Sequence, residues 1–415
     1  MTRIATIGVK YSSNLGDGVI AECLEHALRQ ADPAVEVTAI DLAGRRAFGD
    51  GLNRSRARVL TVLGRVPQPL RRLLVRLLLE SLVRLKLQPL WRQQLAGCDA
   101  VILGGGQLFA DTDLNFPVKI RACLRLVARA GLPAAVHGVG IGGGWSGPGR
   151  RMLRAAVANA RFRAFAVRDA ASQERARREF AGVLDCPVTL CPDPAVLVHE
   201  AYGVPLHRPG AAQRIGLCVA HPGVLSLHAD AGPAAVPVAD FYLGMVRVLA
   251  GRGLHPVCFT NGAGEDETFL REDLVPRLGQ SGLLDRVTIA RRPAVPRELV
   301  ALIGGLDAVV AHRLHASIIA YGLQVPHVGL NWDSKVRSFF AEVGRSAFVV
   351  EPEDAVPDTV LVRLDRAIAE GIDPDVWQHM LARSRAAVAE ALASLSRSVR
   401  AADAAGWRAQ PDAAA

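Results

Sequence analysis

The sequence predicts an α/β protein built from two Rossmann-like domains that face each other across a cleft. Three observations support this fold class. Short apolar stretches typical of buried parallel strands alternate with helical stretches along most of the chain. Several of these strand-like stretches end in loops that are rich in glycine. The 415 residues are also too many for one ordinary core. We therefore expect two domains of roughly 200 residues each.

The first half of the chain contains a series of expected strands separated by loops or helices. A helix is expected to follow the first strand and run to Leu28, and another helix should begin near Ser172. We place the first domain at residues 1–205. Its expected strands span residues 4–9, 35–40, 99–103, 134–138, 165–169 and 187–190.

The second half repeats the same alternation after a stretch at 199–214 that is rich in proline, histidine and glycine and is typical of a linker. We place the second domain at 206–400, and expect the alanine-rich tail at 401–415 to be disordered. The expected strands of this half span residues 215–220, 256–260, 286–289, 306–311 and 327–330.

Composition excludes several classes of protein. No run of about 18 uncharged apolar residues occurs, so we expect neither a membrane span nor a signal peptide. The seven cysteines are scattered without a C-x-x-C pair, which favours reduced thiols in a cytoplasmic protein and implies no zinc site. Aromatic residues are few and no nucleic-acid-binding signature is present, so we expect no nucleic acid partner.

The positive charge of the chain is concentrated in residues 45–92. This segment has twelve basic and two acidic residues, a net +10, whereas the whole chain is +9. Within it, residues 69–91 place Arg72, Arg76, Glu80 and Arg84 at helical spacing among leucines and valines. A basic amphipathic helix suits peripheral contact with the inner face of an anionic membrane, or a lipid-phosphate-linked substrate. The alternative is a helix packed on its own domain with an arginine-rich outer face.

The glycine loops do not match the common nucleotide-binding motifs. Residues 138–143 fit G-x-G-x-x-G, but the loop does not open directly into a helix, and no acid follows before Asp169. NAD binding is therefore not expected. No G-x-x-x-x-G-K-[ST] motif occurs, which excludes a P-loop. What remains are loops at strand ends, where small residues let a ligand approach backbone amides.

Residues 312–315, His-Arg-Leu-His, are the most informative stretch for function. They lie between the apolar strand at 306–311 and an expected helix at 316–323. Imidazole and guanidinium groups at this junction would point to the carboxyl end of a parallel sheet, where such folds bind their ligands. The helix N-terminus would also attract an anion. Arginine binds carboxylate and phosphate in a bidentate manner, and histidine can donate a proton near neutral pH.

Several loops contain short motifs in this order along the chain: Asn14-Leu15-Gly16-Asp17, Gly104-Gly105-Gly106-Gln107-Leu108, Val167-Arg168-Asp169, Asp193-Pro194-Ala195, Arg313-Leu314-His315-Ala316 and Asp333-Ser334-Lys335. In combination, these motifs resemble those of the polysaccharide pyruvyl transferase family. The similar residues lie between about 10 and 345, and residues 45–92 contain no motif of the family. The resemblance implies a fold similar to that of B-type glycosyltransferases, with phosphoenolpyruvate as donor and a glycan or lipid-linked glycan as acceptor. The product would be a pyruvate ketal and phosphate, made without a further cofactor.

Carried onto this chain, the resemblance implies His315 as the general acid and Arg313 as the clamp for the donor's anionic groups. Arg168 and Lys335 are further candidates for the same anion. Other residues are expected to contact the acceptor or to line the cleft, namely Asn14, Gly16, Asp17, Gly105, Gly106 and His221. Asp17 has an alternative interpretation as a helix cap. No metal is expected, because no His, Asp and Glu cluster has ligand spacing.

Two other functions are compatible with the same sequence. One is a glycosyltransferase of the same architecture that uses a nucleotide sugar. The other is a non-catalytic protein of the exopolysaccharide machinery. We expect His137 to be a hydrogen-bonded core residue, and His312 to support the site without contacting substrate.

Overall fold

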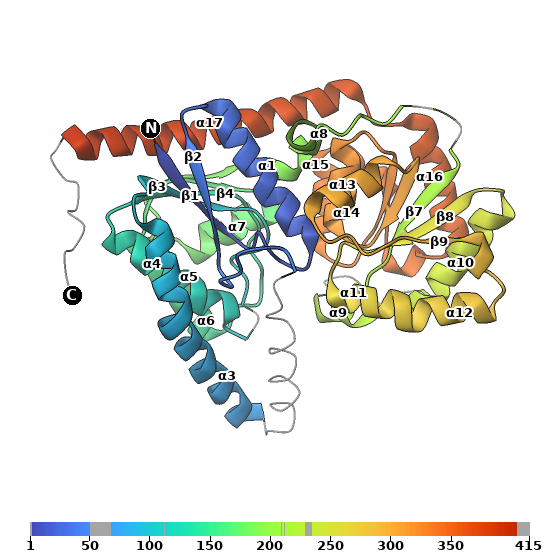
Figure 1. The fold of residues 1–415 in the computed structure, drawn as a ribbon, viewed down its shortest axis with the longest axis horizontal. Helices are drawn as coiled ribbons and strands as arrows, with labels where there is room; N and C mark the ends of the chain where they lie inside the picture. The colour runs from blue at the N-terminus through green and yellow to red at the C-terminus, as the bar shows by residue number, and fades with distance from the viewer. Residues whose placement is uncertain are drawn as a thin grey trace. The chain divides into compact units, whose positions relative to one another are not determined.

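The structure is a computed structural model that describes residues 2–49, 68–111, 113–208, 210, 212–228 and 235–404. The chain divides into two compact units, each with one six-stranded sheet (Figure 1). Unit 1 comprises Met1–Tyr11, Ile20–Pro194 and Arg383–Ala415; unit 2 comprises Ser12–Val19 and Ala195–Ala382. The two Rossmann-like α/β units confirm the fold class predicted from the sequence.

Unit 1 has the strand order β2-β1-β3-β4-β5-β6, with every pairing parallel. The central strands β1, β3 and β4 are almost entirely buried, as expected for a parallel sheet with both faces covered by helices. The strands are β1 (Arg3–Gly8), β2 (Glu36–Asp41), β3 (Ala100–Gly104), β4 (Pro133–Val139), β5 (Arg161–Val167) and β6 (Val188–Leu190). The helices are α1 (Leu15–Ala31), α3 (Gln68–Leu82), the π-helical η1 (Val83–Leu87), α4 (Gln88–Leu95), α5 (Asn115–Arg129), α6 (Gly147–Asn159) and α7 (Ala170–Glu179).

Unit 2 has the order β12-β11-β10-β7-β8-β9, again with all pairings parallel. Its strands are β7 (Arg214–Cys218), β8 (His255–Phe259), β9 (Thr288–Ile289), β10 (Ala308–Ala311), β11 (His327–Leu330) and β12 (Val349–Val350). The helices are α8 (Val198–Tyr202), α9 (Pro222–His228), α10 (Val238–Gly251), α11 (Gly264–Thr268), the π-helical η3 (Phe269–Leu274), α12 (Val275–Gln280), α13 (Pro296–Gly304), α14 (Leu314–Gly322), α15 (Ser334–Glu342) and α16 (Pro357–Glu370). Short 3₁₀ turns are η2 (Pro194–Leu197), η4 (Leu284–Arg286), η5 (Ser346–Phe348) and η6 (Pro352–Asp354).

Two helices contain residues of both units, which the sequence boundary near 205 does not anticipate. The division between the units falls within α1 after Val19 and within α17 (Pro374–Ala404) after Ala382. The tail expected at 401–415 therefore begins as the last turn of α17, and residues 405–415 lie outside the described part of the chain.

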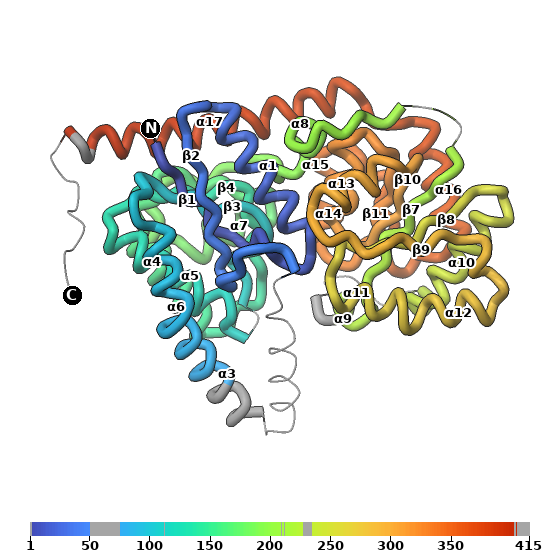
Figure 2. The backbone as a smooth tube through the Cα atoms, in the orientation of Figure 1, coloured from blue at the N-terminus to red at the C-terminus, as the bar shows by residue number. Residues whose placement is uncertain are grey.

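The basic segment is only partly described, because residues 50–67 lie outside the described ranges. From Gln68 onward it forms α3, η1 and α4, which matches the helix predicted at 69–91. One face packs into unit 1 through buried Val83, Leu87 and Trp91. In both views α3 leads away from the sheet of unit 1 (Figure 1; Figure 2). Within the described ranges, no helix has the length and hydrophobicity that crossing a bilayer requires.

Candidate functional site

The strand order of unit 2 creates a topological switch point between β7 and β10. The two strands pair with each other in the middle of the sheet. After β7 the chain continues to β8 and β9 on one side, and after β10 it continues to β11 and β12 on the other side. In this strand order a ligand binds outside the carboxyl ends of the strands at the switch point. His221 lies in the loop after β7, and Arg313 directly precedes α14 after β10. Two of the residues predicted from the sequence therefore lie at the edge where the fold favours a ligand.

Arg313 is held by a carboxylate that sequence analysis missed. Its Nε and Nη2 donate to the two oxygens of Asp266, at 2.8 and 2.6 Å. Asp266 lies on α11 and is fully buried. Its Oδ1 also accepts the backbone N–H of His221 at 2.9 Å. One carboxylate thus connects the loops that follow β7, β8 and β10.

His315 packs directly against the first turn of α1. A Cβ atom built on Gly16 would lie 2.4 Å from Nδ1 and 2.5 Å from Cβ of His315. Contacts this short do not occur, so this approach requires glycine at position 16. The backbone N–H of Leu15 donates to the carbonyl of Asn261 (2.8 Å), which fixes the same turn to the end of β8. Although the sequence places this loop in the first domain, its packing assigns Ser12–Val19 to unit 2.

Asn14 and Asp17 flank Gly16 in this loop. The backbone N–H of Asp17 donates to the carbonyl of Asn14 (3.1 Å), and Asp17 lies in the first turn of α1, where a negative charge favours the helix. Oδ1 of Asn14 and Nδ2 of Asn261 are both buried and have no hydrogen-bond partner among the described residues. Buried polar atoms are normally hydrogen-bonded, so one acceptor and one donor here are available to a ligand or to water.

His312 is held by a hydrogen bond with Tyr242 and is neutral. Its Nδ1 lies 2.7 Å from the hydroxyl of Tyr242, and its ring is buried. Burial, with a smaller contribution from the charge of Arg313, lowers the pKa of His312 to about 3. A proton donor near neutral pH is therefore not available at His312, which agrees with the supporting role expected for it.

Lys335 lies in the first turn of α15 and contacts two neighbouring side chains. Its Nζ is 2.7 Å from Oδ2 of Asp333 and 4.4 Å from the centre of the Trp332 ring. Oδ1 of Asp333 also accepts the backbone N–H of Lys335 and caps the helix. Asp333 therefore compensates the charge of Lys335, as Asp266 compensates that of Arg313.

Arg168 belongs to unit 1 and is enclosed between two carboxylates. Its side chain is 7 % exposed and lies 3.5 Å from Asp169 and 3.7 Å from Asp193. The guanidinium covers Gly140, where an added Cβ would lie 2.8 Å from Nη2. Asp193, part of the motif Asp193-Pro194-Ala195, thus forms an ion pair with Arg168.

The glycines after β3 adopt a conformation that other residues rarely reach. Gly105 and Gly106 have φ of +70° and +66°. The loop approaches the end of β4 through a hydrogen bond from the N–H of Gly105 to the carbonyl of His137 (3.2 Å). Both glycines lie in unit 1 at the β1/β3 switch point of its sheet.

His137 differs from the sequence expectation. It is a core residue, but neither ring nitrogen has a hydrogen-bond partner among the described residues. Burial lowers the pKa of His137 to about 4, so the ring is neutral. The apolar strand pattern places a residue in the core, but it cannot show whether its nitrogens find partners.

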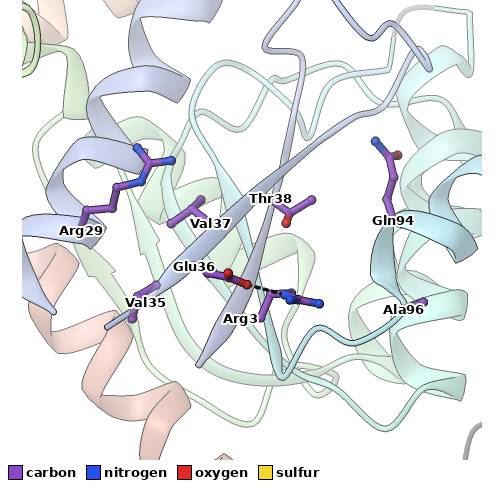
Figure 3. Close-up of a pocket in the computed structure, with 8 residues that line it drawn as sticks. All are labelled: Arg3, Arg29, Val35, Glu36, Val37, Thr38, Gln94 and Ala96. Atoms are coloured by element: carbon purple, nitrogen blue, oxygen red, sulfur yellow. Dashed lines mark hydrogen bonds and ion pairs between the residues drawn. The ribbon is translucent and has the colours of Figure 1, made fainter. Parts of the chain in front are cut away.

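Two cavities of unit 1 lie beside the edge strand β2. One, of about 470 Å³, lies at the amino ends of β1 and β2, where Arg3 and Glu36 form an ion pair (Figure 3). A second, of about 450 Å³, includes Tyr11, Arg45 and Arg46. In the described ranges, no group of three or more His, Cys, Asp or Glu residues could hold a metal ion.

Comparison with known proteins identifies a family and a fold. The sequence model of the family described as polysaccharide pyruvyl transferase matches residues 14–334. The search of curated proteins finds no significant match. Similar solved structures include a putative UDP-N-acetylglucosamine 2-epimerase from Listeria monocytogenes (12 % identity, 96 % of this chain and 97 % of that chain, TM-score 0.54).

Two further solved structures are similar at the same level. The UDP-GlcNAc 2-epimerase of Methanocaldococcus jannaschii has 11 % identity, coverage of 90 % of this chain and 94 % of that chain, and a TM-score of 0.51. The α,α-trehalose 6-phosphate synthase of Burkholderia multivorans has 14 % identity, 99 % coverage of both chains and a TM-score of 0.50. At such low identity these similarities establish the fold alone.

Proposed function

This chain belongs to the polysaccharide pyruvyl transferase family, and we propose that it transfers the pyruvyl group of phosphoenolpyruvate to two hydroxyls of a sugar, giving a pyruvate ketal and phosphate. The family assignment makes the protein a transferase that acts on a polysaccharide. The observation that best supports the donor is the position of Arg313 directly before α14 and of His315 in its first turn, at the switch point of unit 2.

Arg313 suits the donor because phosphoenolpyruvate carries a carboxylate and a phosphate. Asp266 accepts from Nε and Nη2 of the guanidinium, and Nη1 makes no hydrogen bond among the described residues. Nη1 can therefore donate to an anionic oxygen of the donor. The first N–H groups of α14, which follow Arg313 directly, provide further donors. The carboxylate of Asp266 compensates the charge of Arg313 and so reduces the net positive charge of this part of the site.

His315 is the proposed acid for the first chemical step. It donates a proton to the methylene carbon of phosphoenolpyruvate, which leaves a cation at C2, and the first sugar hydroxyl adds to C2. Phosphate then departs with its bridging electron pair, and the second hydroxyl adds to C2 to close the ketal. Of the two protons released by the hydroxyls, one restores His315 and the other leaves with phosphate, so the reaction is balanced.

The loop of Asn14 is proposed to orient the acceptor hydroxyls. The unpartnered Oδ1 of Asn14 can accept from a hydroxyl, and Nδ2 of Asn261 can donate to a sugar oxygen. Gly16 allows this loop to pack directly against His315, which places the acceptor contacts beside the proposed acid. Lys335 and Arg168 stay candidates for donor binding in this proposal, each already accompanied by a carboxylate.

Turnover with labelled donor tests this function. Purified protein is incubated with carbon-labelled phosphoenolpyruvate and a panel of glycans and lipid-linked glycans, and phosphate release and label in the glycan are measured together. We expect both to appear in equal amounts and to be lost in His315→Ala. A nucleotide-sugar glycosyltransferase would instead be protected against heat by a nucleoside diphosphate and not by phosphoenolpyruvate. Failure of every acceptor to gain label would contradict the proposal.

The outer face of α3 and η1 supports a further part of the proposal, contact with an anionic membrane. Four of the nine large apolar side chains that are exposed among the described residues lie here: Leu77, Leu78, Leu82 and Leu85, at 51 %, 52 %, 43 % and 73 % exposure. Arg84 and Lys86 are exposed beside them. Apolar side chains with adjacent basic groups match the chemistry of an anionic lipid surface, which would hold the enzyme close to a lipid-linked acceptor.

Vesicle sedimentation tests the membrane contact. The protein should sediment with vesicles that contain anionic lipid and much less with neutral vesicles, and high salt should weaken the binding. Leu78→Gln combined with Leu85→Gln should abolish binding, whereas Leu190→Gln, at a single exposed leucine on β6, should leave it unchanged. Vesicle binding by the double variant equal to that of the original protein would contradict a lipid partner. The same conclusion would follow if the double substitution left vesicle binding unchanged and abolished self-association of the protein.

A further inference from the structure

The ion pair between Arg313 and Asp266 has the geometry that fixes a guanidinium plane. Nε and Nη2 lie side by side on one edge of the group, and each donates to a different oxygen of the same carboxylate. Such a pair is more specific in orientation than a single contact. Asp266 is fully buried and the side chain of Arg313 is 14 % exposed, so water competes little for either group.

The anchor of Arg313 is itself held in place. Oδ1 of Asp266 also accepts the N–H of His221 at 2.9 Å, which connects the carboxylate to the loop after β7. The ring of His221 packs on Phe269, 5.8 Å between ring centres, and Phe269 directly follows the helix that carries Asp266. The carboxylate therefore has one position relative to the ends of β7 and β10, and so does the guanidinium that it binds.

Stability alone does not account for a charged pair at this place. Apolar side chains of similar volume often replace a buried ion pair without loss of stability. Here Arg313 lies two residues before His315, and the pair with Asp266 leaves Nη1 and the second N–H of Nη2 for a ligand. We propose that Asp266 is a positioning residue, which aligns Nη1 of Arg313 with the donor; this inference rests on the function proposed above.

The pair also determines how loss of Asp266 should appear in kinetics. Without the carboxylate, Arg313 keeps its charge and gains freedom to rotate. A free, uncompensated guanidinium can still attract an anionic donor, so donor binding should persist while alignment is lost. Turnover should then decrease more than affinity, which a purely structural residue would not produce.

Asp266→Asn tests the alignment, with Glu267→Gln as the matched control on the same helix. Glu267 contacts Arg271 and Thr260 and none of the residues proposed to act. KM for phosphoenolpyruvate and kcat are measured by phosphate release. The folded fraction of each variant is measured by circular dichroism, and kcat is expressed per folded molecule. For Asp266→Asn we expect kcat to fall by about tenfold or more with KM within about threefold of the original protein, whereas Glu267→Gln should retain activity within about twofold.

The possible outcomes are distinct. Unchanged kcat in Asp266→Asn, or an increase in KM with kcat retained, would overturn the positioning role. If the original protein itself does not consume phosphoenolpyruvate with any acceptor, the proposed function is wrong, and the inference about Asp266 is wrong with it. Should Asp266→Asn not fold, Arg313→Lys keeps the charge but cannot form two parallel bonds. The same loss of kcat is then expected, and normal kcat in Arg313→Lys would overturn the inference.

Discussion

Gly16 and His315 are in such close packing that a Cβ on Gly16 would lie 2.4 Å from Nδ1 of His315. The contact connects two sequence motifs that are far apart in the chain. It also explains why the first turn of α1 groups with unit 2, although most of α1 belongs to unit 1. The position of the proposed acid therefore depends on a residue that has no side chain.

Gly16→Ala should displace the imidazole of His315. The added methyl group overlaps the ring, so we expect a loss of about 1–3 kcal/mol in unfolding free energy and a fall in kcat of about tenfold or more. Denaturant unfolding and phosphate release measure the two effects. Gly279→Ala, where an added Cβ meets nothing within 4 Å, is the control. Normal kcat in Gly16→Ala would show that this contact does not position the acid.

The protein should lose stability as the pH falls from 7 to 5. Burial lowers the pKa values of His137, His312 and His327 to about 4, 3 and 3. In the unfolded chain these rings take up protons near pH 6.5, so the unfolded state binds more protons in this range and acid favours unfolding. Each histidine contributes up to about 1.4 kcal/mol per pH unit below 6.5. Urea midpoints at three pH values measure the slope, and His137→Gln should reduce it.

Removal of Asp193 should destabilise unit 1 strongly. Arg168 lies between Asp193 and Asp169 and is 7 % exposed, so Asp193→Ala leaves a buried charge with less compensation. We expect a loss of about 3 kcal/mol in unfolding free energy. The exposed pair of Arg252 and Asp365, at 51 % and 49 % exposure, is the comparison, because Asp365→Ala should cost less than about 1 kcal/mol. Similar costs for both would mean that Arg168 is not electrostatically buried.

Sequence patterns predicted the strands well where the apolar run was long. The strand expected at 286–289 is only Thr288–Ile289, because Leu284–Arg286 forms a helical turn, and the two-residue β12 is too short for any periodicity to reveal. The expected helix at 316–323 begins two residues earlier, at Leu314, where Arg313 already has the extended conformation of a helix cap.

Contacts across the chain were beyond the reach of the sequence. The motif around Arg313 predicted an anion-binding residue, but nothing in it indicates that Asp266, which lies 47 residues away, is its partner. The only signal was the acidic stretch Glu265-Asp266-Glu267, which a loop of four residues separates from the strand expected at 256–260. Likewise, the glycine of Asn14-Leu15-Gly16-Asp17 was expected in the first domain, because sequence order does not show which sheet a loop packs against.

Equilibrium titration of phosphoenolpyruvate tests the central claim most directly. Calorimetry should give saturable binding of phosphoenolpyruvate to the original protein and to Arg366→Ala, which removes an exposed ion pair with Glu370 and a contact with the Phe348 ring, both away from the proposed site. Arg313→Ala should bind at least about tenfold more weakly, because a charged hydrogen bond in the site is lost. Equal affinity in Arg313→Ala and the original protein would contradict the claim that Arg313 receives the donor.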